Sequence, residues 1–102
     1  MNYGTDTMRL AVYEKEIIIN TLKEVFGNVK ILLFGSRLDD TKKGGDIDLF
    51  ILPEERSNLL EKKIKSLAKL ERALHKPVDI VVHKNFERAI EKEIMKTNIL
   101  LR

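Results

Sequence analysis

Three aspartates carry the chemistry that this sequence could support. Asp46 and Asp48 stand two residues apart, directly before the apolar run 49–52. In a strand such residues point to the same face, with β-carbons roughly 7 Å apart along the chain. Two carboxylates side by side at a hydrophobic strand are costly unless a cation lies between them. A divalent metal with oxygen ligands, Mg²⁺ by default, is the simplest such cation.

The third aspartate, Asp79, lies in another apolar run, between Val78 and Ile80. If the two runs form neighbouring strands, which are about 4.8 Å apart, Asp79 can reach the face that carries Asp46 and Asp48. Three carboxylates at one end of a sheet would make a two-metal site, with ions about 3.5–4 Å apart. Asp46 and Asp48 would bridge both ions. Asp79 would hold the ion that activates an attacking hydroxyl and would act as general base.

A Gly-Ser pair upstream fits the other half of such a reaction. Gly35 ends the apolar run 30–34 and is followed by Ser36 and Arg37. A glycine at a strand end lets the backbone approach a polyphosphate, to which the next N–H groups and the Ser36 hydroxyl donate. Arg37 either binds phosphate as well or faces water. The expected reaction is in-line attack at the α-phosphorus of a nucleoside triphosphate, catalysed by positioning and charge neutralisation.

Each of these signals is weak when taken alone. Asp-x-Asp also fits two acids in an exposed turn after Gly44 and Gly45, and Asp79 alone could be a surface acid on an edge strand. Any strand can end in Gly-Ser. The three signals together, in this order along the chain, favour the metal-dependent nucleotide site.

The flanking patterns predict the elements that position these residues. They indicate helices over about 6–26, from Ser57 or Asn58 to about 74, and from Asn85 to about 98. They indicate strands over 29–34, 46–52 and 78–83, with 99–102 an extended tail or a small strand. Apolar residues at helical spacing are expected on the buried helix faces, among them Tyr13, Leu60, Ile64, Leu67, Leu74 and Ile90. The order predicts an α/β (α+β) fold with a small sheet of three to four strands flanked by helices.

Length and composition set the class of protein. The 102 residues suit a single domain, 1–102, and the net charge of +3 favours contact with phosphates or an acidic partner but falls short of a nucleic-acid tail. The absence of cysteine excludes disulfides, thiolate zinc sites and cysteine nucleophiles. Neither a secretory leader nor an apolar run of about 18 residues is present. These features predict a cytoplasmic protein.

The order of the motifs resembles the nucleotidyltransferase superfamily that includes DNA polymerase β. In length the chain is most similar to the minimal nucleotidyltransferases of prokaryotes, which are commonly encoded beside a small all-helical HEPN-domain protein and act as its antitoxin. One departure is the gap of nine residues between Ser36 and Asp46, which is often ten in these minimal proteins. The matching stretches are Phe34-Gly35-Ser36-Arg37, Gly45-Asp46-Ile47-Asp48-Leu49 and Val78-Asp79-Ile80-Val81.

The resemblance implies a polymerase β palm-like fold with a mixed sheet. It also implies a function, nucleotidyl transfer. Asp46, Asp48 and Asp79 would be catalytic residues and ligands of two Mg²⁺ ions, while Gly35, Ser36 and Arg37 would bind the nucleotide. ATP would be the substrate, and AMP would be moved to a hydroxyl, a tyrosine of a cognate HEPN toxin, in a type VII-like toxin–antitoxin pair. No second domain follows Arg102, so the acceptor is expected on a partner or on a second copy.

Other functions stay open at this point. The main alternative is a non-catalytic antitoxin that neutralises its partner by covering it. Transfer to a small molecule such as an antibiotic is less expected, because no second domain forms a pocket. Polymerisation on nucleic acid is least expected, because a basic groove rich in aromatic residues is missing. The sequence leaves the base preference and the assembly state, homo- or hetero-oligomer, undecided.

Overall fold

A four-stranded sheet lies at the centre of the computed structural model, which describes residues 10–35 and 46–102. Its strands are β1 (Val29–Phe34), β2 (Ile47–Pro53), β3 (Val78–Val82) and β4 (Ile99–Leu101), in the order β3-β2-β1-β4. β1 pairs antiparallel with β2 and with β4, whereas β2 and β3 are parallel. The expected small mixed sheet is therefore confirmed, and the segment after residue 98 forms its fourth strand.

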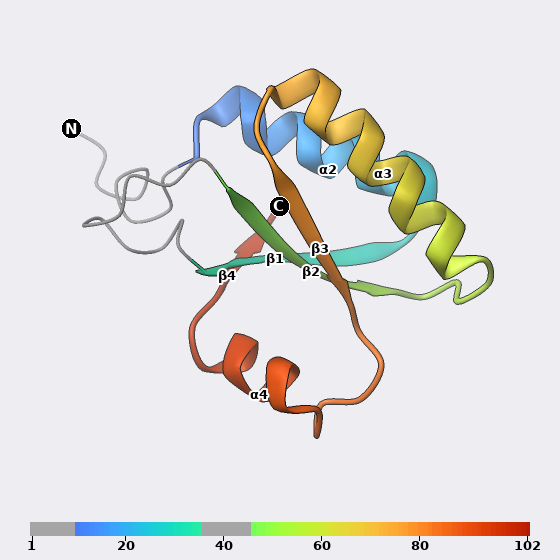
Figure 1. Cartoon of the computed structure of the whole chain (residues 1–102), viewed down its shortest axis with the longest axis vertical. Coiled ribbons are helices and arrows are strands. Elements are labelled where there is room, and N and C mark those ends of the chain that lie inside the picture. The colour runs from blue at the N-terminus through green and yellow to red at the C-terminus, as the bar shows by residue number, and fades with distance from the viewer. Residues whose placement is uncertain (1–9, 36–45) are drawn as a thin grey trace.

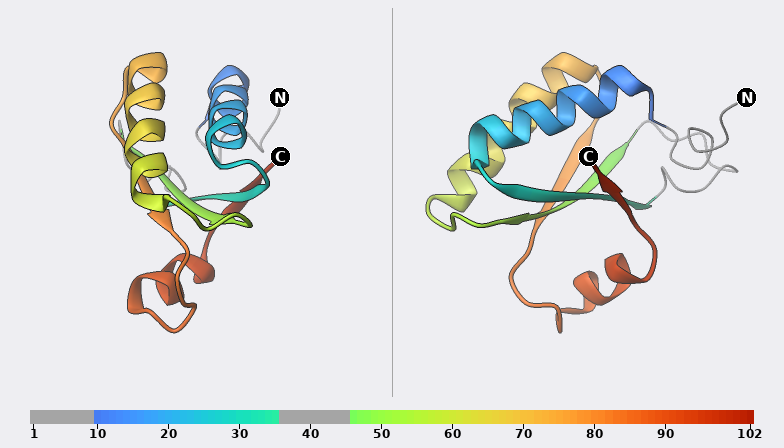
Figure 2. Two further views of the ribbon diagram at one scale, coloured as in Figure 1. Left: turned by 90° about the vertical axis from the view of Figure 1, so that its right-hand side faces the viewer. Right: turned by 180° about the vertical axis from the view of Figure 1, so that it is seen from behind.

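Helices cover the two faces of the sheet unequally. α2 (Val12–Phe26) and α3 (Leu59–Leu74) lie side by side over one face, and the short α4 (Ala89–Lys96) lies on the opposite side (Figures 1 and 2). α3 connects β2 to β3, which gives the parallel pair the long crossover that it needs. In the part of the chain that the structure describes, no helix is long and apolar enough to cross a membrane.

The main core lies between α2, α3 and the sheet, and a smaller apolar cluster lies under α4. Side chains of β1 alternate between them: Ile31 and Leu33 enter the main core, and Leu32 joins Phe50 and Ile94 on the α4 side. Alternation of this kind follows from the pleat of a strand. β1 is thus covered on both faces, as its nearly continuous apolar sequence predicts.

α2 keeps its predicted end but not all of its predicted inner face. Gly27 follows the helix with φ +76°, and its N–H donates to the Lys23 carbonyl at 2.9 Å. The helix begins at Val12, after Ala11 as an extended N-cap residue, so the predicted helix is wrong at residues 10 and 11, and its expected start near residue 6 lies outside the described residues. Tyr13 is exposed, contrary to expectation, and the neighbouring Glu14 is buried instead. The carboxylate of Glu14 is stabilised there by an ion pair with Lys76 and a hydrogen bond from the Ala11 N–H at 3.1 Å.

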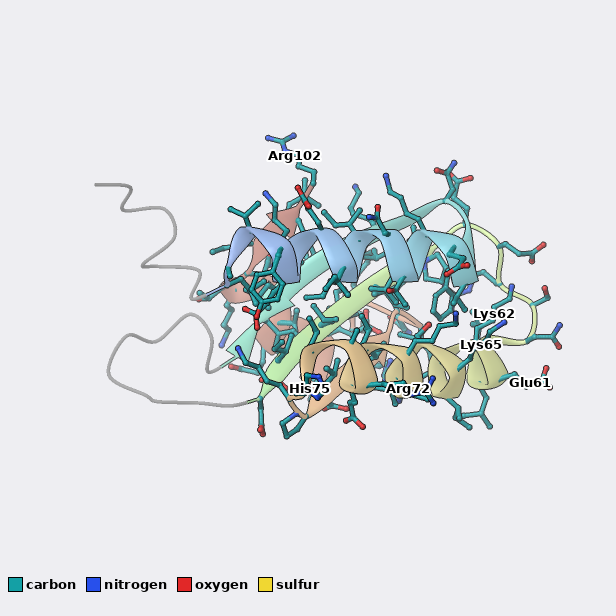
Figure 3. The ribbon with its side chains drawn as sticks, turned by 90° about the horizontal axis from the view of Figure 1, so that it is seen from above. Glu61, Lys62, Lys65, Arg72, His75 and Arg102 are labelled. Atoms are coloured by element: carbon teal, nitrogen blue, oxygen red, sulfur yellow. The ribbon has the colours of Figure 1, made fainter. Side chains whose placement is uncertain are left out.

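α3 buries only part of the expected stripe: Leu74 is buried and Leu67 packs against the main core, as expected. Ser66, Leu70 and Leu74 face the core, whereas Leu60 and Ile64 are exposed, so their expected burial is wrong. Asn58 occupies the N-cap position in the left-handed conformation, without the side-chain hydrogen bond expected of a cap. Figure 3 shows charged side chains spread along the helix, which agrees with a solvated outer face; they are Glu61, Lys62, Lys65 and Arg72.

α4 is shorter than predicted. Asn85 does not cap it, because the Asn85 side chain accepts a hydrogen bond from the Glu87 N–H at 2.8 Å in a local turn. The chain therefore becomes helical only after Arg88, which is the N-cap residue. Ile94 is buried under the sheet, while Ile90 is exposed, contrary to expectation.

Candidate active site

Asp48 and Asp79 stand directly opposite each other in the parallel pair of β2 and β3. Their neighbours in the strands, Ile47, Leu49 and Ile80, are buried in the main core. Because side chains alternate along a strand, both aspartates lie on the other face of the sheet, the one that α2 and α3 leave uncovered. The two apolar runs are thus neighbouring strands, in a register that brings two of the three aspartates together.

Two hydrogen bonds hold the start of β3 in this register. The Ile47 N–H donates to the Pro77 carbonyl at 3.0 Å, and the Val78 N–H donates to Glu71 Oε2 at 3.0 Å. Glu71 lies in the last turn of α3, so this carboxylate ties the helix to the strand that follows it. The position of Asp79 therefore depends on α3 as well as on β2.

Asp46, the third predicted ligand, directly precedes β2 and is exposed. Within residues 10–35 and 46–102, no three His, Cys, Asp or Glu side chains are gathered closely enough to hold a metal ion as they stand. The structure therefore brings together the pair Asp48 and Asp79, not a finished set of three carboxylates. An all-carboxylate donor set is nevertheless the kind that Mg²⁺ selects, together with water and phosphate oxygens.

Gly35 packs its backbone against the carboxylate of Asp48. A β-carbon built on Gly35 would overlap Asp48 Oδ2 and would lie only 3.0 Å from Cγ. The backbone at Gly35 also has φ +83°, which side chains other than hydrogen disfavour. The end of β1 and the start of β2 thus meet at one corner, as the predicted site requires. Ser36 and Arg37, the other predicted nucleotide ligands, lie outside the described residues.

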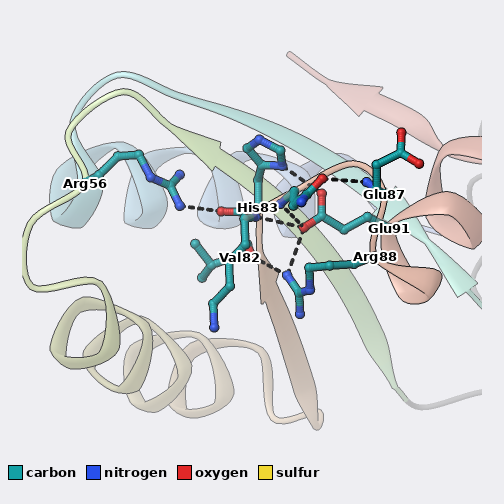
Figure 4. A network of polar contacts seen from close by, with 8 residues as sticks. Arg56, Val82, His83, Glu87, Arg88 and Glu91 are labelled. Carbon is teal, nitrogen blue, oxygen red and sulfur yellow. Dashed lines mark hydrogen bonds and ion pairs between the residues drawn. The ribbon is translucent and has the colours of Figure 1, made fainter.

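A buried carboxylate that the sequence analysis missed fixes α4 against the end of β3 (Figure 4). Glu91 is 0% exposed and accepts backbone hydrogen bonds from Lys84 at 2.8 Å and Asn85 at 3.1 Å. His83 Nδ1 lies 2.7 Å from Glu91 Oε1, and Arg88 Nη1 lies 2.8 Å from Oε2. A carboxylate in an ionised state only accepts hydrogen bonds, so His83 carries its proton on Nδ1 here.

The hydrogen bonds decide the charge state of Glu91. Burial raises the pKa of this carboxyl, but the backbone N–H of Lys84, the His83 ring, the Asn85 N–H and Arg88 together outweigh burial and lower the pKa from 4.5 to about 2. Glu91 stands three residues before Ile94, on the inner face of the helix. In the sequence, Glu91 occupies a position where the helical pattern places apolar residues, and Arg88 precedes it by one turn. These two features were the signal that could have predicted a buried, paired carboxylate.

The comparisons with known proteins agree with this geometry. Residues 16–102 match the family described as polymerase beta, nucleotidyltransferase. A search of curated proteins found no match.

Three solved structures share the fold. The first is a structure of a tri-AMPylated Shewanella oneidensis HEPN toxin in complex with MNT antitoxin. The matching chain is 23% identical, with a TM-score of 0.69, and the match covers 88% of the present protein and 70% of the matching chain. A second Shewanella oneidensis protein is 18% identical, with a TM-score of 0.71, over 91% and 72%. A toxin–antitoxin with AMP-PNP is 24% identical, with a TM-score of 0.70, over 86% and 72%. Because the family match covers most of the sequence, this chain belongs to the polymerase beta nucleotidyltransferase family.

Proposed function

We propose that this protein is a Mg²⁺-dependent nucleotidyltransferase that moves AMP from ATP to a hydroxyl group. The observation that carries the proposal is the corner at which Asp48 faces Asp79 across β2 and β3 while the Gly35 backbone packs on the Asp48 carboxylate. Such a corner offers anionic ligands for cations beside a backbone that a phosphate can approach closely. Membership of the nucleotidyltransferase family supports the same reaction class.

Each residue has a role in the proposed reaction. Asp46, Asp48 and Asp79 would hold the divalent ions. When bound, the ions would neutralise charge on the phosphate oxygens. Gly35, Ser36 and Arg37 would bind the triphosphate. The acceptor oxygen attacks the α-phosphorus, its proton passes to Asp79, and the bond to the β-phosphate breaks as pyrophosphate leaves.

We further propose that the acceptor is a tyrosine hydroxyl on a HEPN toxin and that the transfer silences this toxin in the cytoplasm. Support comes from two proteins of the same fold: one is complexed with a tri-AMPylated HEPN toxin, and the other belongs to a toxin–antitoxin with AMP-PNP. Asp79 lies on the edge strand β3 and is exposed. A partner protein could present a side chain there.

Incubation of the protein with Mg²⁺, α-labelled ATP and the HEPN protein encoded beside it tests the proposal. We expect labelled partner with the wild type and none with Asp48→Asn, because one ligand charge is lost at the corner. Glu61→Gln, an exposed acid on the far side of α3, is the matched control and should transfer label normally. Equal labelling by Asp48→Asn and the wild type would refute the catalytic assignment, and unlabelled partner would refute the acceptor.

A second candidate is an antitoxin that neutralises by binding alone. The exposed apolar pair Leu60 and Ile64 on α3 favours it, since apolar side chains grouped at a surface often mark protein contacts. The double substitution Asp46→Asn/Asp48→Asn separates the two candidates. Loss of neutralisation while the complex still forms supports catalysis, and retained neutralisation supports binding alone.

A further inference from the structure

We propose that Phe86 and Ile90 form the docking surface for the protein that carries the acceptor hydroxyl, an inference that rests on the proposed function. Phe86 lies in the turn between β3 and α4, and Ile90 lies in the first turn of α4. Both side chains are large and apolar, and each is 45% exposed. Exposed apolar surface beside a reaction site is typical of protein contacts.

Phe86 lies on the same face of the sheet as the two aspartates. The His83 N–H continues the ladder of β3 by donating to the Ile51 carbonyl at 2.8 Å, and His83 follows Asp79 by four residues, so both side chains point to one face. The His83 ring lies 6.1 Å from the ring of Phe50, in the apolar cluster under α4. The Phe86 ring lies 4.2 Å from the His83 ring. The turn that carries Phe86 therefore stands on the face that α2 and α3 leave open.

The Phe86 ring is held in place although it is half exposed. It packs on the His83 ring, and His83 Nδ1 lies 2.7 Å from the buried Glu91 (Figure 4). Glu91 also accepts hydrogen bonds from the N–H groups of Lys84 and Asn85, which directly precede Phe86. A ring that is already fixed loses little conformational entropy when a partner covers it. Aromatic anchors of this kind carry much of the binding energy in protein interfaces.

Distance ties this surface to the acceptor. His83, on which Phe86 packs, lies about 13 Å along β3 from Asp79, the proposed base. A standard protein interface buries about 800 Å² on each partner, so it is roughly 30 Å across and extends about 15 Å from its centre. A protein that presents a hydroxyl to Asp79 over such an interface therefore reaches Phe86 as well. Ile90 belongs to the same area, because it lines a hollow together with Gly35 at the corner of the candidate site.

The charges around the surface favour an apolar protein partner over a polyanion such as nucleic acid. The three cations of residues 88–96 are each paired with an acid: Arg88 with Glu91 at 2.8 Å, Lys92 with Glu87 at 3.3 Å, and Lys96 with Glu93 at 2.9 Å. Cations that already have acidic neighbours offer little net charge to phosphates. The occupant is therefore a largely uncharged protein surface that carries the hydroxyl.

The affinity for the HEPN protein encoded beside this one, measured by titration calorimetry without ATP, tests the surface. The variant is Phe86→Ser, and the matched control is Tyr13→Ser, at an aromatic residue that is 60% exposed on α2, over the opposite face of the sheet. We expect Phe86→Ser to weaken binding by about 30-fold or more, as for an aromatic anchor, and Tyr13→Ser to bind normally. Phe86→Leu keeps an apolar side chain on His83 and should weaken binding less, by about three- to tenfold.

Two further measurements separate docking from the candidate site. Both Phe86 variants should bind a Mg²⁺-bound, non-hydrolysable ATP analogue like the wild type. In the labelling assay, Phe86→Ser should raise the KM for the partner, and saturating partner should restore the rate of transfer.

The other outcomes distinguish a failure of the surface from a failure of the proposed function. Equal affinity of the wild type and both Phe86 variants for the partner would overturn the surface and leave the candidate site intact. Equal losses in Tyr13→Ser and Phe86→Ser would overturn it too, and so would weaker binding of the ATP analogue by both Phe86 variants, since Phe86 would then support the nucleotide site. A wild type that does not bind the partner would refute the HEPN acceptor and the surface with it. A wild type that binds the partner but transfers no label would refute the proposed function, while the affinities would still decide the surface.

Discussion

The ionised Glu91 should make the stability of this protein depend on pH in a defined window. The pKa of this carboxyl is lowered to about 2 in the folded protein, from an ordinary value of 4.5. A group with a lowered folded pKa contributes stability that is fully present above its unfolded pKa and is lost as the pH falls toward the folded pKa. The contribution of Glu91 is therefore complete above about pH 5 and disappears between about pH 4.5 and pH 2.

The size of the contribution follows from the same values. A fall from 4.5 to about 2, at about 1.4 kcal/mol per pH unit, corresponds to about 3 kcal/mol. Domains of this size have free energies of unfolding of about 5–15 kcal/mol. Glu91→Gln keeps the shape of the side chain but loses the charge that four donors stabilise. We expect this variant to remain folded at pH 7 and to be about 3 kcal/mol less stable.

Urea unfolding followed by circular dichroism, from pH 7 to pH 3, measures the effect. The difference in the free energy of unfolding between the wild type and Glu91→Gln should be constant above about pH 5 and should shrink steadily below pH 4.5. Glu93→Gln is the control, because Glu93 lies on the same helix, is exposed and pairs with Lys96 at the surface. Its effect should stay below about 1 kcal/mol at every pH.

A difference that stays the same down to pH 3 would refute the reasoning, since the two states would then not differ in the pKa of this carboxyl. An equal effect of Glu93→Gln would refute it in another way. The loss would then reflect charge on α4 in general, not the buried contacts of Glu91.

Two further substitutions test the geometry of the candidate site. Gly35→Ala should lower the free energy of unfolding by about 1–2 kcal/mol, because Gly35 has a positive φ. It should also abolish Mg²⁺-dependent ATP binding, because the new methyl group displaces the Asp48 carboxylate, and normal ATP binding in titration calorimetry would contradict this. Glu71→Ala should lower the free energy of unfolding by about 1 kcal/mol, because the Val78 N–H loses its acceptor. Glu71→Gln keeps an acceptor and should lose less stability in urea unfolding, and equal losses in the two variants would show that the hydrogen bond is not the cause.

Local patterns were enough to predict the sheet and the side on which the aspartates lie. Side chains alternate between the two faces of a strand, and each aspartate stands between two apolar residues, so the face of Asp48 and Asp79 followed once the strands were assigned. The pairing of the two strands was inferred from chemistry, because acids within apolar strands are costly unless they share a bound cation. The register that sets Asp48 opposite Asp79 confirms the pairing of these strands.

Long-range contacts explain what the sequence did not predict. The start of α4 depends on Glu91, which binds the backbone of residues 84 and 85, and no local pattern shows which donors a distant carboxylate will meet. On α3, Leu60 and Ile64 have helical spacing just as the buried stripe does. Only the packing of α3 against α2 and β3 decides which of two apolar stripes faces inward.

The unequal cover of the two faces of the sheet links the fold to the proposed chemistry. α2 and α3 complete one face, so an aspartate pointing that way would be buried among apolar side chains at great cost. α4 is only eight residues long and covers part of the other face, over Leu32 and Phe50. The open remainder contains Asp48 and Asp79. The proposed chemistry therefore needs the face of the sheet that α2 and α3 leave open.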